Sequence, residues 1–346
     1  MGEKIRLLIV EDSMVMRKMI QQLVESDPAI EVVGAATNGR EGVEMALALR
    51  PDVITMDVRM PIMDGLQALK AIMDECPTRV LMLSAMTTEG ADETLEALES
   101  GAVDFLPKGD GGKPGNLSKF RQLLVGKIRA VMKSHLTHFL SATPTPVQPK
   151  KSLPRPAVSH RGRIEVVLIG TSTGGPNALQ TVIPKLPADL PVGVLVVQHM
   201  PATFTQQLAR RLDQSSALQV KEAEEGDKIQ PGRLLLAPGH SHLVLRQRGQ
   251  VGLEKEPSNL LHRPAVDVML DSAAGIYGAH VLGVILTGMG QDGKVGAAEL
   301  KKRGGRLIAQ DEATSVVYGM PRAVADLADQ VCHLEQISAA ILASLS

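Results

Sequence analysis

Residues 165–175 read EVVLIGTSTGG, an apolar run that leads into a cluster of small residues. The run is typical of a buried parallel strand and a helical pattern follows it, so the sequence predicts a strand, a sharp turn and a helix. The letters GTSTG satisfy the nucleophile-elbow pattern GxSxG, which requires that context. Small neighbours leave room for a substrate carbonyl, and a helix N-terminus favours negative charge beside the serine. Ser172 is therefore the candidate nucleophile.

The same residues also fit a glycine-rich phosphate loop, because backbone N–H groups at the start of a helix can cradle an anion. No Walker-type lysine follows the glycines, which weakens this alternative. The side chains that accompany Ser172 elsewhere in the chain favour a catalytic site.

Two further side chains complete the candidate site. His199 follows an apolar run at residues 194–197, and Asp292 follows another at 280–286. Ligands bind at the carboxyl ends of parallel strands, so we expect both side chains beside Ser172, with His199 as base and Asp292 orienting its imidazole. Taken singly, His199 fits a structural histidine and Asp292 a helix N-cap. The chain order Ser, His, Asp differs from that of α/β-hydrolases.

Strand-like runs alternate with helical patterns in both halves of the chain. In the N-terminal half the runs lie at residues 5–10, 31–36, 53–56, 80–83 and 103–106, and in the C-terminal half at 165–169, 193–197, 234–237, 280–286 and 306–309. We expect an α/β protein with two doubly wound domains, the first a flavodoxin-like (βα)5 unit. Residues 242–256 predict a small antiparallel hairpin. His240 and His242 lack companion ligands at metal spacing and are interpreted as structural.

The predicted domains cover residues 1–134 and 164–346, and a basic, proline-rich linker covers 135–163. A chain of 346 residues is long enough for two cores. A net charge of -1 gives no reason to expect nucleic acid as a partner. Two distant cysteines, Cys76 and Cys332, indicate a reducing compartment, and no apolar run approaches the roughly 18 residues of a membrane span. We therefore expect a cytoplasmic protein without membrane insertion.

Acidic residues follow two predicted strands of the N-terminal half, with Glu11 and Asp12 after the first and Asp57 after the third. Ser84 follows the fourth strand and Lys108 the fifth. Clustered carboxylates suit a hard divalent cation, while a hydroxyl and an ammonium group could stabilise a phosphoryl group on Asp57. The simpler interpretation, that each acid only caps a helix, accounts poorly for all five positions together.

With Met60, Pro61, Asp64 and Gly65 in the pattern MPxxDG, these positions resemble two-component receiver domains over residues 4 to about 130. The resemblance implies that Asp57 accepts a phosphoryl group, that Glu11, Asp12 and Asp57 hold Mg²⁺, and that Ser84 and Lys108 bind the phosphoryl group. Phe105 stands where receivers usually carry a switching aromatic residue. Gly109, where receivers usually have proline, departs from the pattern.

The motifs GTSTGG, QHMP and LTGMGxDG, in this order behind a receiver, resemble CheB-type protein-glutamate methylesterases of chemotaxis. The resemblance covers nearly the whole chain outside the linker. It implies Ser172 as nucleophile, His199 as general acid and base, and Asp292 as orienting carboxylate. It also implies that the N–H of Met289 helps to hold an oxyanion and that Thr173 assists in the same pocket. No cofactor is expected for the hydrolase chemistry.

The function implied is hydrolysis of glutamyl methyl esters on methyl-accepting chemoreceptors with release of methanol, activated when a chemotaxis histidine kinase donates a phosphoryl group. Deamidation of receptor glutamine is a second expected activity, because the tetrahedral intermediate differs only in its leaving group. Two alternatives stay open. The C-terminal domain could be a binding module behind a receiver that acts as a phosphate sink, or it could be an esterase for small molecules.

Overall fold

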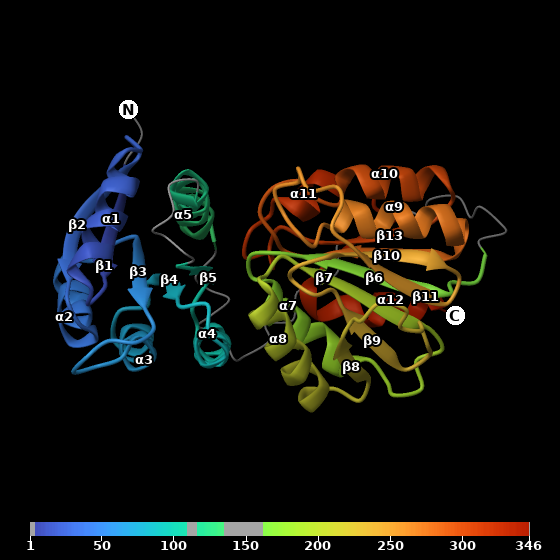
Figure 1. The fold of residues 1–346 in the computed structure, drawn as a ribbon, viewed down its shortest axis with the longest axis horizontal. Coiled ribbons are helices and arrows are strands. Elements are labelled where there is room, and N and C mark those ends of the chain that lie inside the picture. Colours follow the sequence, from blue (N-terminus) through green and yellow to red (C-terminus); the bar gives the residue numbers. More distant parts are fainter. Residues whose placement is uncertain (1–3, 109–115, 135–161, 346) are drawn as a thin grey trace.

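The structure is a computed structural model that describes residues 4–108, 116–134 and 162–345. It contains two parallel sheets, one in each half of the chain, and Figure 1 shows them side by side. The expected α/β architecture with two parallel sheets is therefore confirmed. The predicted boundaries at residues 134 and 164 stay predictions, because most of the linker and Gly109 lie outside the described residues.

The first sheet has five parallel strands in the order β2-β1-β3-β4-β5. Its strands are β1 (Ile5–Val10), β2 (Ile30–Ala36), β3 (Val53–Asp57), β4 (Arg79–Ser84) and β5 (Asp104–Pro107). The connecting helices are α1 (Met14–Glu25), α2 (Gly39–Leu49), α3 (Gly65–Glu75), α4 (Thr88–Glu99) and α5 (Asn116–Met132). Leu7 and Ile9 pack on the side of α1 and α5, whereas Leu8 and Val10 pack on the side of α2, α3 and α4. Burial of both faces explains why the strands are apolar throughout.

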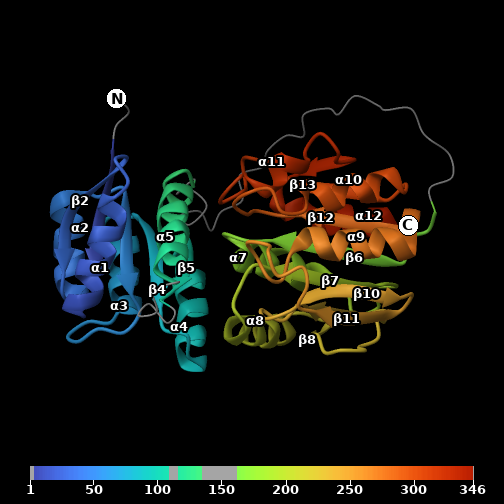
Figure 2. The same cartoon turned by 45° about the horizontal axis from the view of Figure 1, so that its top comes forward.

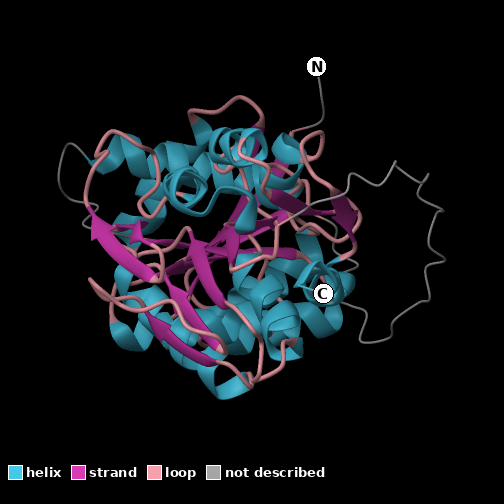
Figure 3. Cartoon of the chain, turned by 90° about the vertical axis from the view of Figure 1, so that its right-hand side faces the viewer, coloured by secondary structure: helices cyan, strands magenta, loops and turns pink. Residues whose placement is uncertain are grey.

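The second sheet has seven parallel strands in the order β14-β13-β12-β6-β7-β9-β8. Its strands are β6 (Val166–Thr171), β7 (Gly193–Gln198), β8 (Gln219–Glu222), β9 (Arg233–Leu236), β12 (Val281–Ile285), β13 (Arg306–Gln310) and β14 (Gln330–Cys332). Its helices are α7 (Gly175–Val182), α8 (Ala202–Ser215), α9 (Val266–Tyr277), α10 (Lys294–Lys302), α11 (Met320–Val324) and α12 (Ile337–Leu345). Figure 3 shows these strands between helices on both sides.

The predicted hairpin is present as β10 (His242–Gln247) and β11 (Gln250–Glu254), which pair antiparallel. It packs against α9 on one side of the larger sheet. β8 and β14 are two short edge strands that the apolar pattern did not predict. No helix among the described residues is long and apolar enough to cross a membrane.

The two halves contact each other at the β5 edge of the smaller sheet, where α4 and α5 flank this edge strand. α4 packs on α7 and α8, and Figure 2 shows α4 and α5 on the side of the first half that faces the second. The rings of Phe105 in β5 and Phe204 in α8 stack with their centroids 4.6 Å apart. Val316 and Val317 join the apolar cluster that contains α5. β5 therefore lies in the contact between the halves.

Candidate active site and phosphorylation site

Three neighbouring strands bring the candidate catalytic residues to one edge of the larger sheet. Ser172 follows β6, His199 follows β7, and Asp292 lies in the loop after β12. β6 lies between β7 and β12, so the three carboxyl ends are adjacent. Main-chain hydrogen bonds tie the loops together: Ser172 N donates to Thr287 O at 3.0 Å, and His199 N donates to Thr171 O at 3.2 Å. The predicted convergence at the sheet edge is observed.

Glycine makes the turn at Ser172 possible. Gly174 has φ of +77°, and a Cβ at this position would lie 2.6 Å from Val316, so a side chain would meet both strain and a neighbour. Gly288 lies opposite the turn, where a Cβ would come within 2.8 Å of Ser172 Cβ. Gln198 Nε2 donates to Ser172 O at 2.9 Å and supports the turn from β7. Ser172 is consequently held in place and only 8% exposed.

His199 and Asp292 form a close pair, with 2.7 Å between Nε2 and Oδ2. Asp292 also accepts hydrogen bonds from Val266 N at 2.7 Å and Asp267 N at 2.8 Å. Burial opposes its ionisation, but the His199 contact and these backbone donors outweigh burial and lower the pKa of Asp292 to about 2. An ionised Asp292 requires a hydrogen on Nε2, so in the neutral form of the ring Nδ1 carries the lone pair. Nδ1 is buried and has no hydrogen-bond partner within the described parts of the chain.

Two residues near this pair were missed by sequence reasoning. The rings of His262 and His199 stack with their centroids 4.0 Å apart. Asp267 lies against Asp292 and accepts a hydrogen bond from Gly296 N at 2.7 Å. Burial first, and then the charge of Asp292, raise the pKa of Asp267 to about 6. Both residues lie outside the recognised motifs, His262 in the loop before α9 and Asp267 in the first turn of α9, and no periodic signal marks them.

Thr173 and Met289 both belong to the C-terminal half and lie where it contacts the N-terminal half. Thr173 Oγ1 donates to Asp104 Oδ2 in β5 at 2.7 Å. Asp104 also forms an ion pair with Lys127 of α5. Met289 lines a cavity of about 460 Å³ that includes Gly126 and Arg129 of α5 and Tyr318 after β13. The residues beside the candidate nucleophile therefore contact the N-terminal half directly.

The carboxylates of Glu11, Asp12 and Asp57 gather at the corresponding edge of the smaller sheet, with oxygen atoms within 4.8 Å of one another. Lys108 Nζ lies 2.8 Å from Glu11 Oε2 and 2.6 Å from Asp57 Oδ2. Burial and the neighbouring Asp57 raise the pKa of Glu11 against the opposing effect of Lys108. Three clustered carboxylates form a hard, anionic oxygen donor set, which fits Mg²⁺. Four of the predicted phosphorylation-site residues thus lie together.

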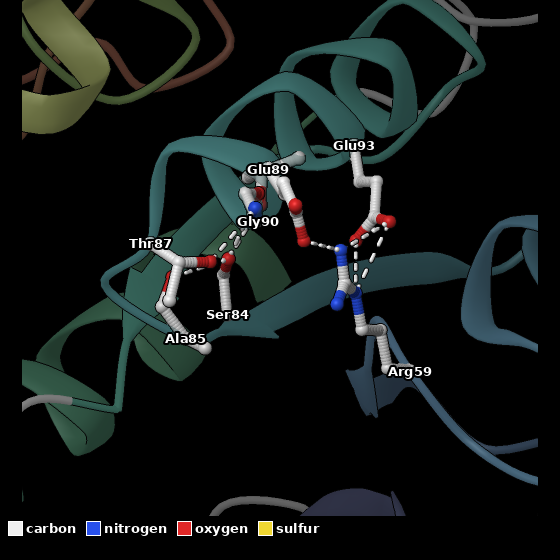
Figure 4. Close-up of polar contacts among 8 residues, drawn as sticks. Arg59, Ser84, Ala85, Thr87, Glu89, Gly90 and Glu93 are labelled. Carbon is white, nitrogen blue, oxygen red and sulfur yellow. Dashed lines mark hydrogen bonds and ion pairs between the residues drawn. The ribbon is translucent and has the colours of Figure 1, made fainter.

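Ser84 ends β4 as predicted, but its hydroxyl is turned toward the first turns of α4 (Figure 4). Its Oγ donates to Gly90 O at 3.1 Å and accepts from Thr94 Oγ1 at 2.7 Å. Nearby, Arg59 forms ion pairs with Glu89 and Glu93 of α4, each at 2.9 Å. The loop after Asp57 and the loop after Ser84 are therefore both connected to α4.

His242 is fully buried and holds the loop between β11 and α9 in place. Its Nδ1 accepts from Ala265 N at 3.1 Å, and its Nε2 lies 3.2 Å from Pro257 O. Burial lowers the pKa of His242, which favours the neutral ring that these two contacts require. This environment agrees with the structural interpretation of the residue.

Comparisons with known proteins match both halves. Residues 167–341 match the CheB methylesterase family, and residues 7–113 match the response regulator receiver domain. The chain is 45% identical over 353 residues to a protein-glutamate methylesterase/protein-glutamine glutaminase of Geobacter sulfurreducens, covering 98% of this chain and 97% of that protein. It is 46% identical to a protein of the same description from Pseudomonas aeruginosa, covering 96% of this chain and 97% of the relative.

Among solved structures, the crystal structure of the Thermotoga maritima CheB methylesterase catalytic domain matches with a TM-score of 0.50 and 47% identity. The match covers 52% of this chain and 98% of that domain. It agrees with the parallel α/β architecture of the second half.

Gly288→Ala tests how tightly the turn at Ser172 is built. The added methyl group would lie 2.3 Å from Met320 Sδ and 2.8 Å from Ser172 Cβ, so it should displace the serine. We expect fluorophosphonate labelling of Ser172 to slow by about 100-fold, the scale of a displacement near 1 Å. Gly275→Ala is the control, because its Cβ would meet nothing within 4 Å. Equal labelling rates in the two variants would contradict the described geometry.

Asp267→Asn tests the carboxyl pair through stability. The pKa of Asp267 is raised by folding from 3.8 to about 6, so its contribution to stability is full below pH 3.8 and is lost as pH rises through 6. Asparagine removes the charge and can keep the contacts to Asp292 and Gly296. We expect the variant to be about 1 kcal/mol more stable than the parent at pH 8, since solvent screens the half-buried carboxyl, and no more stable at pH 4. Urea unfolding at both values measures this, and a gain that does not depend on pH would contradict it.

Proposed function

Because the chain belongs to the CheB methylesterase family and carries a response regulator receiver domain, we propose that it is a phosphorylation-activated hydrolase of glutamyl methyl esters on chemoreceptors. The observation that carries the proposal is the His199–Asp292 pair on the strand edge that also carries Ser172, in which Asp292 accepts a hydrogen bond from Nε2 and leaves Nδ1 available as the base. The relatives named above supply the substrate class.

The proposed reaction begins when Ser172 Oγ attacks the ester carbonyl and His199 Nδ1 takes its proton. Asp292 stabilises the imidazolium, and main-chain N–H groups that include Met289 stabilise the oxyanion. Methoxide leaves with the proton from His199 as methanol, which gives a glutamyl-serine ester. Water then attacks this ester while His199 takes its proton, and His199 returns that proton to Ser172 Oγ as the acyl bond breaks, which frees the serine and leaves a glutamic acid that ionises to the carboxylate. With a glutamine side chain the first leaving group is ammonia, so deamidation follows the same steps.

The proposed regulation starts at Asp57, which accepts a phosphoryl group from a chemotaxis histidine kinase. Glu11, Asp12 and Asp57 would hold Mg²⁺, which neutralises charge during phosphoryl transfer. Lys108 is close enough to Asp57 to bind the phosphoryl group, and Ser84 would have to rotate away from α4 to do so. We also propose that the receiver domain covers residues 1–134, that the catalytic domain covers residues 164–346, and that the protein acts in the cytoplasm.

The described arrangement supports an inhibited state. Asp104 accepts a hydrogen bond from Thr173, the residue next to the nucleophile, and Phe105 stacks on Phe204. At the far end of the contact, Arg211 Nη1 pairs with Glu99 at 2.8 Å. With these contacts in place Ser172 is only 8% exposed, which leaves little room for a glutamyl side chain of another protein at the nucleophile. Lys108 follows β5 directly. A phosphoryl group on Asp57 that attracts Lys108 would therefore pull on the end of β5 and change how this strand contacts the catalytic edge.

The alternative of a binding module behind a phosphate sink makes no use of the buried His199–Asp292 pair. The alternative of a small-molecule esterase uses the same pair, and receptor-bound esters must be compared with soluble ones to distinguish it. Rapid turnover of simple esters with none on methylated receptor would favour that alternative.

Methanol release from methylated chemoreceptor tests the main proposal. With Mg²⁺ and a small phosphodonor, the wild type should accelerate, Asp57→Ala should keep only its basal rate, and Ser172→Ala should be inactive, because these changes remove the switch and the nucleophile respectively. Full activity of Ser172→Ala would refute the assigned mechanism. Equal acceleration of Asp57→Ala and wild type would refute the assigned switch.

Arg211→Ala tests the inhibitory contact without removing a buried group. Exposed ion pairs contribute about 0.2–1 kcal/mol, so methanol release without phosphodonor should rise by roughly 1.4-fold to fivefold. Arg210→Ala is the control, because Arg210 is the adjacent arginine of α8 and carries the same charge. A rise of equal size in both variants, or no rise in Arg211→Ala, would contradict the inhibitory role of this contact.

A further inference from the structure

The loop between β11 and α9 brings a second imidazole to the catalytic base. The rings of His262 and His199 are nearly parallel, with an interplanar angle of 12° and centroids 4.0 Å apart. Both ends of the loop are fixed, because His242 contacts Pro257 O and Ala265 N, while Val266 N and Asp267 N donate to Asp292. The same carboxylate therefore fixes His199 and the loop that carries His262.

Hydrogen bonding holds the His199 ring at one nitrogen only. His199 is held at Nε2 by Asp292, while its Nδ1 has no hydrogen-bond partner within the described residues. A single hydrogen bond at one nitrogen does not by itself fix the tilt of the ring, so the tilt depends on the groups that pack around this buried side chain. The face of His262 restricts this tilt from one side, and a restricted ring keeps Nδ1 directed toward one position. Beside His262, Leu261 is 51% exposed and lies on the outer side of the loop.

We propose that His262 is a positioning residue for the catalytic base, and that its ring holds the imidazole of His199 by face-to-face stacking and so fixes the direction of Nδ1 at the catalytic edge. This inference rests on the proposed function and adds a residue to its machinery. His262 is not required to exchange a proton or to touch the substrate.

The charge state of His262 agrees with this role. Burial first, and then the neighbouring His199, lower the pKa of His262 to about 3, so the ring is neutral at physiological pH. When His199 takes the proton of Ser172 it becomes a cation, and a neutral aromatic face attracts a cation in this position. A charged His262 would instead repel it. The stack therefore favours the state that His199 must adopt during the reaction.

The test compares an aromatic and a non-aromatic replacement in the full chain with Mg²⁺ and phosphodonor present. His262→Ala removes the ring face, and kcat for methanol release is expected to fall by about 100-fold while KM changes less than about twofold, because the base and not substrate binding is affected. His262→Phe keeps a flat uncharged face and should recover kcat to within about fivefold. Leu261→Ala, in the same loop, is the control for loop perturbation.

Two measurements separate positioning from a merely structural role. Thermal unfolding shows whether the two His262 variants are folded to the same extent. The pH profile of His262→Phe should superimpose on that of the wild type, because the wild-type ring does not titrate near neutrality. A displaced profile would mean that His262 exchanges protons, and would overturn the proposal.

The remaining outcomes are also decisive. If His262→Ala keeps kcat within twofold, or if His262→Phe is as slow as His262→Ala with both folded, the stacking role is wrong. Activity of Ser172→Ala would instead overturn the proposed function. An inactive Ser172→Ala beside an unimpaired His262→Ala would leave the proposed function standing and remove only this inference.

Discussion

Parallel strand order is the constraint on which both sites depend. All strands of a parallel sheet end at the same edge, so residues that follow different strands meet there without being close in sequence. In the larger sheet this places Ser172, His199 and Asp292 after three adjacent strands, although 120 residues separate the first from the last. In the smaller sheet it gathers Glu11, Asp57 and Lys108. Burial of both faces keeps the strands rigid and leaves the loops to carry the chemistry.

β5 links these two edges. Lys108, directly after the strand, contacts Asp57, while Asp104, at its start, holds the hydroxyl of Thr173 beside the nucleophile. A hydrogen bond contributes about 0.5–1.5 kcal/mol net, and an aromatic pair about 0.5–1.5 kcal/mol beyond its burial. The contact between the halves is therefore built from several small contributions. In the proposed regulation such a sum is well suited to control, because a ligand that binds the two states differently need supply only a few kcal/mol to change their balance.

The sequence predicted the fold to the extent that apolar patterns control it. The ten buried strands that it indicated and the hairpin are present, because each fills a core or pairs locally. β8 reads QVKE and β14 reads QVC, and these short edge strands have too few apolar positions to produce a signal. The candidate catalytic residues were found because each follows a buried strand within a recognisable motif.

Residues whose position depends on tertiary contacts were beyond sequence reasoning. His262 reaches His199 only because a loop anchored by His242 folds back over the catalytic edge. Asp267 contacts Asp292 only because α9 and the loop after β12 begin side by side. Likewise, Thr173 was expected to assist in the pocket, but in this structure its hydroxyl binds Asp104 of the other half, which no local pattern records.

The central claim is that the N-terminal half covers a reactive Ser172 until Asp57 is phosphorylated. The most direct test is the rate at which a bulky fluorophosphonate labels Ser172 in the wild type, measured by mass spectrometry of the peptide with and without phosphodonor and Mg²⁺. The account predicts slow labelling that accelerates on phosphorylation. A labelling rate that is the same in both conditions would contradict it.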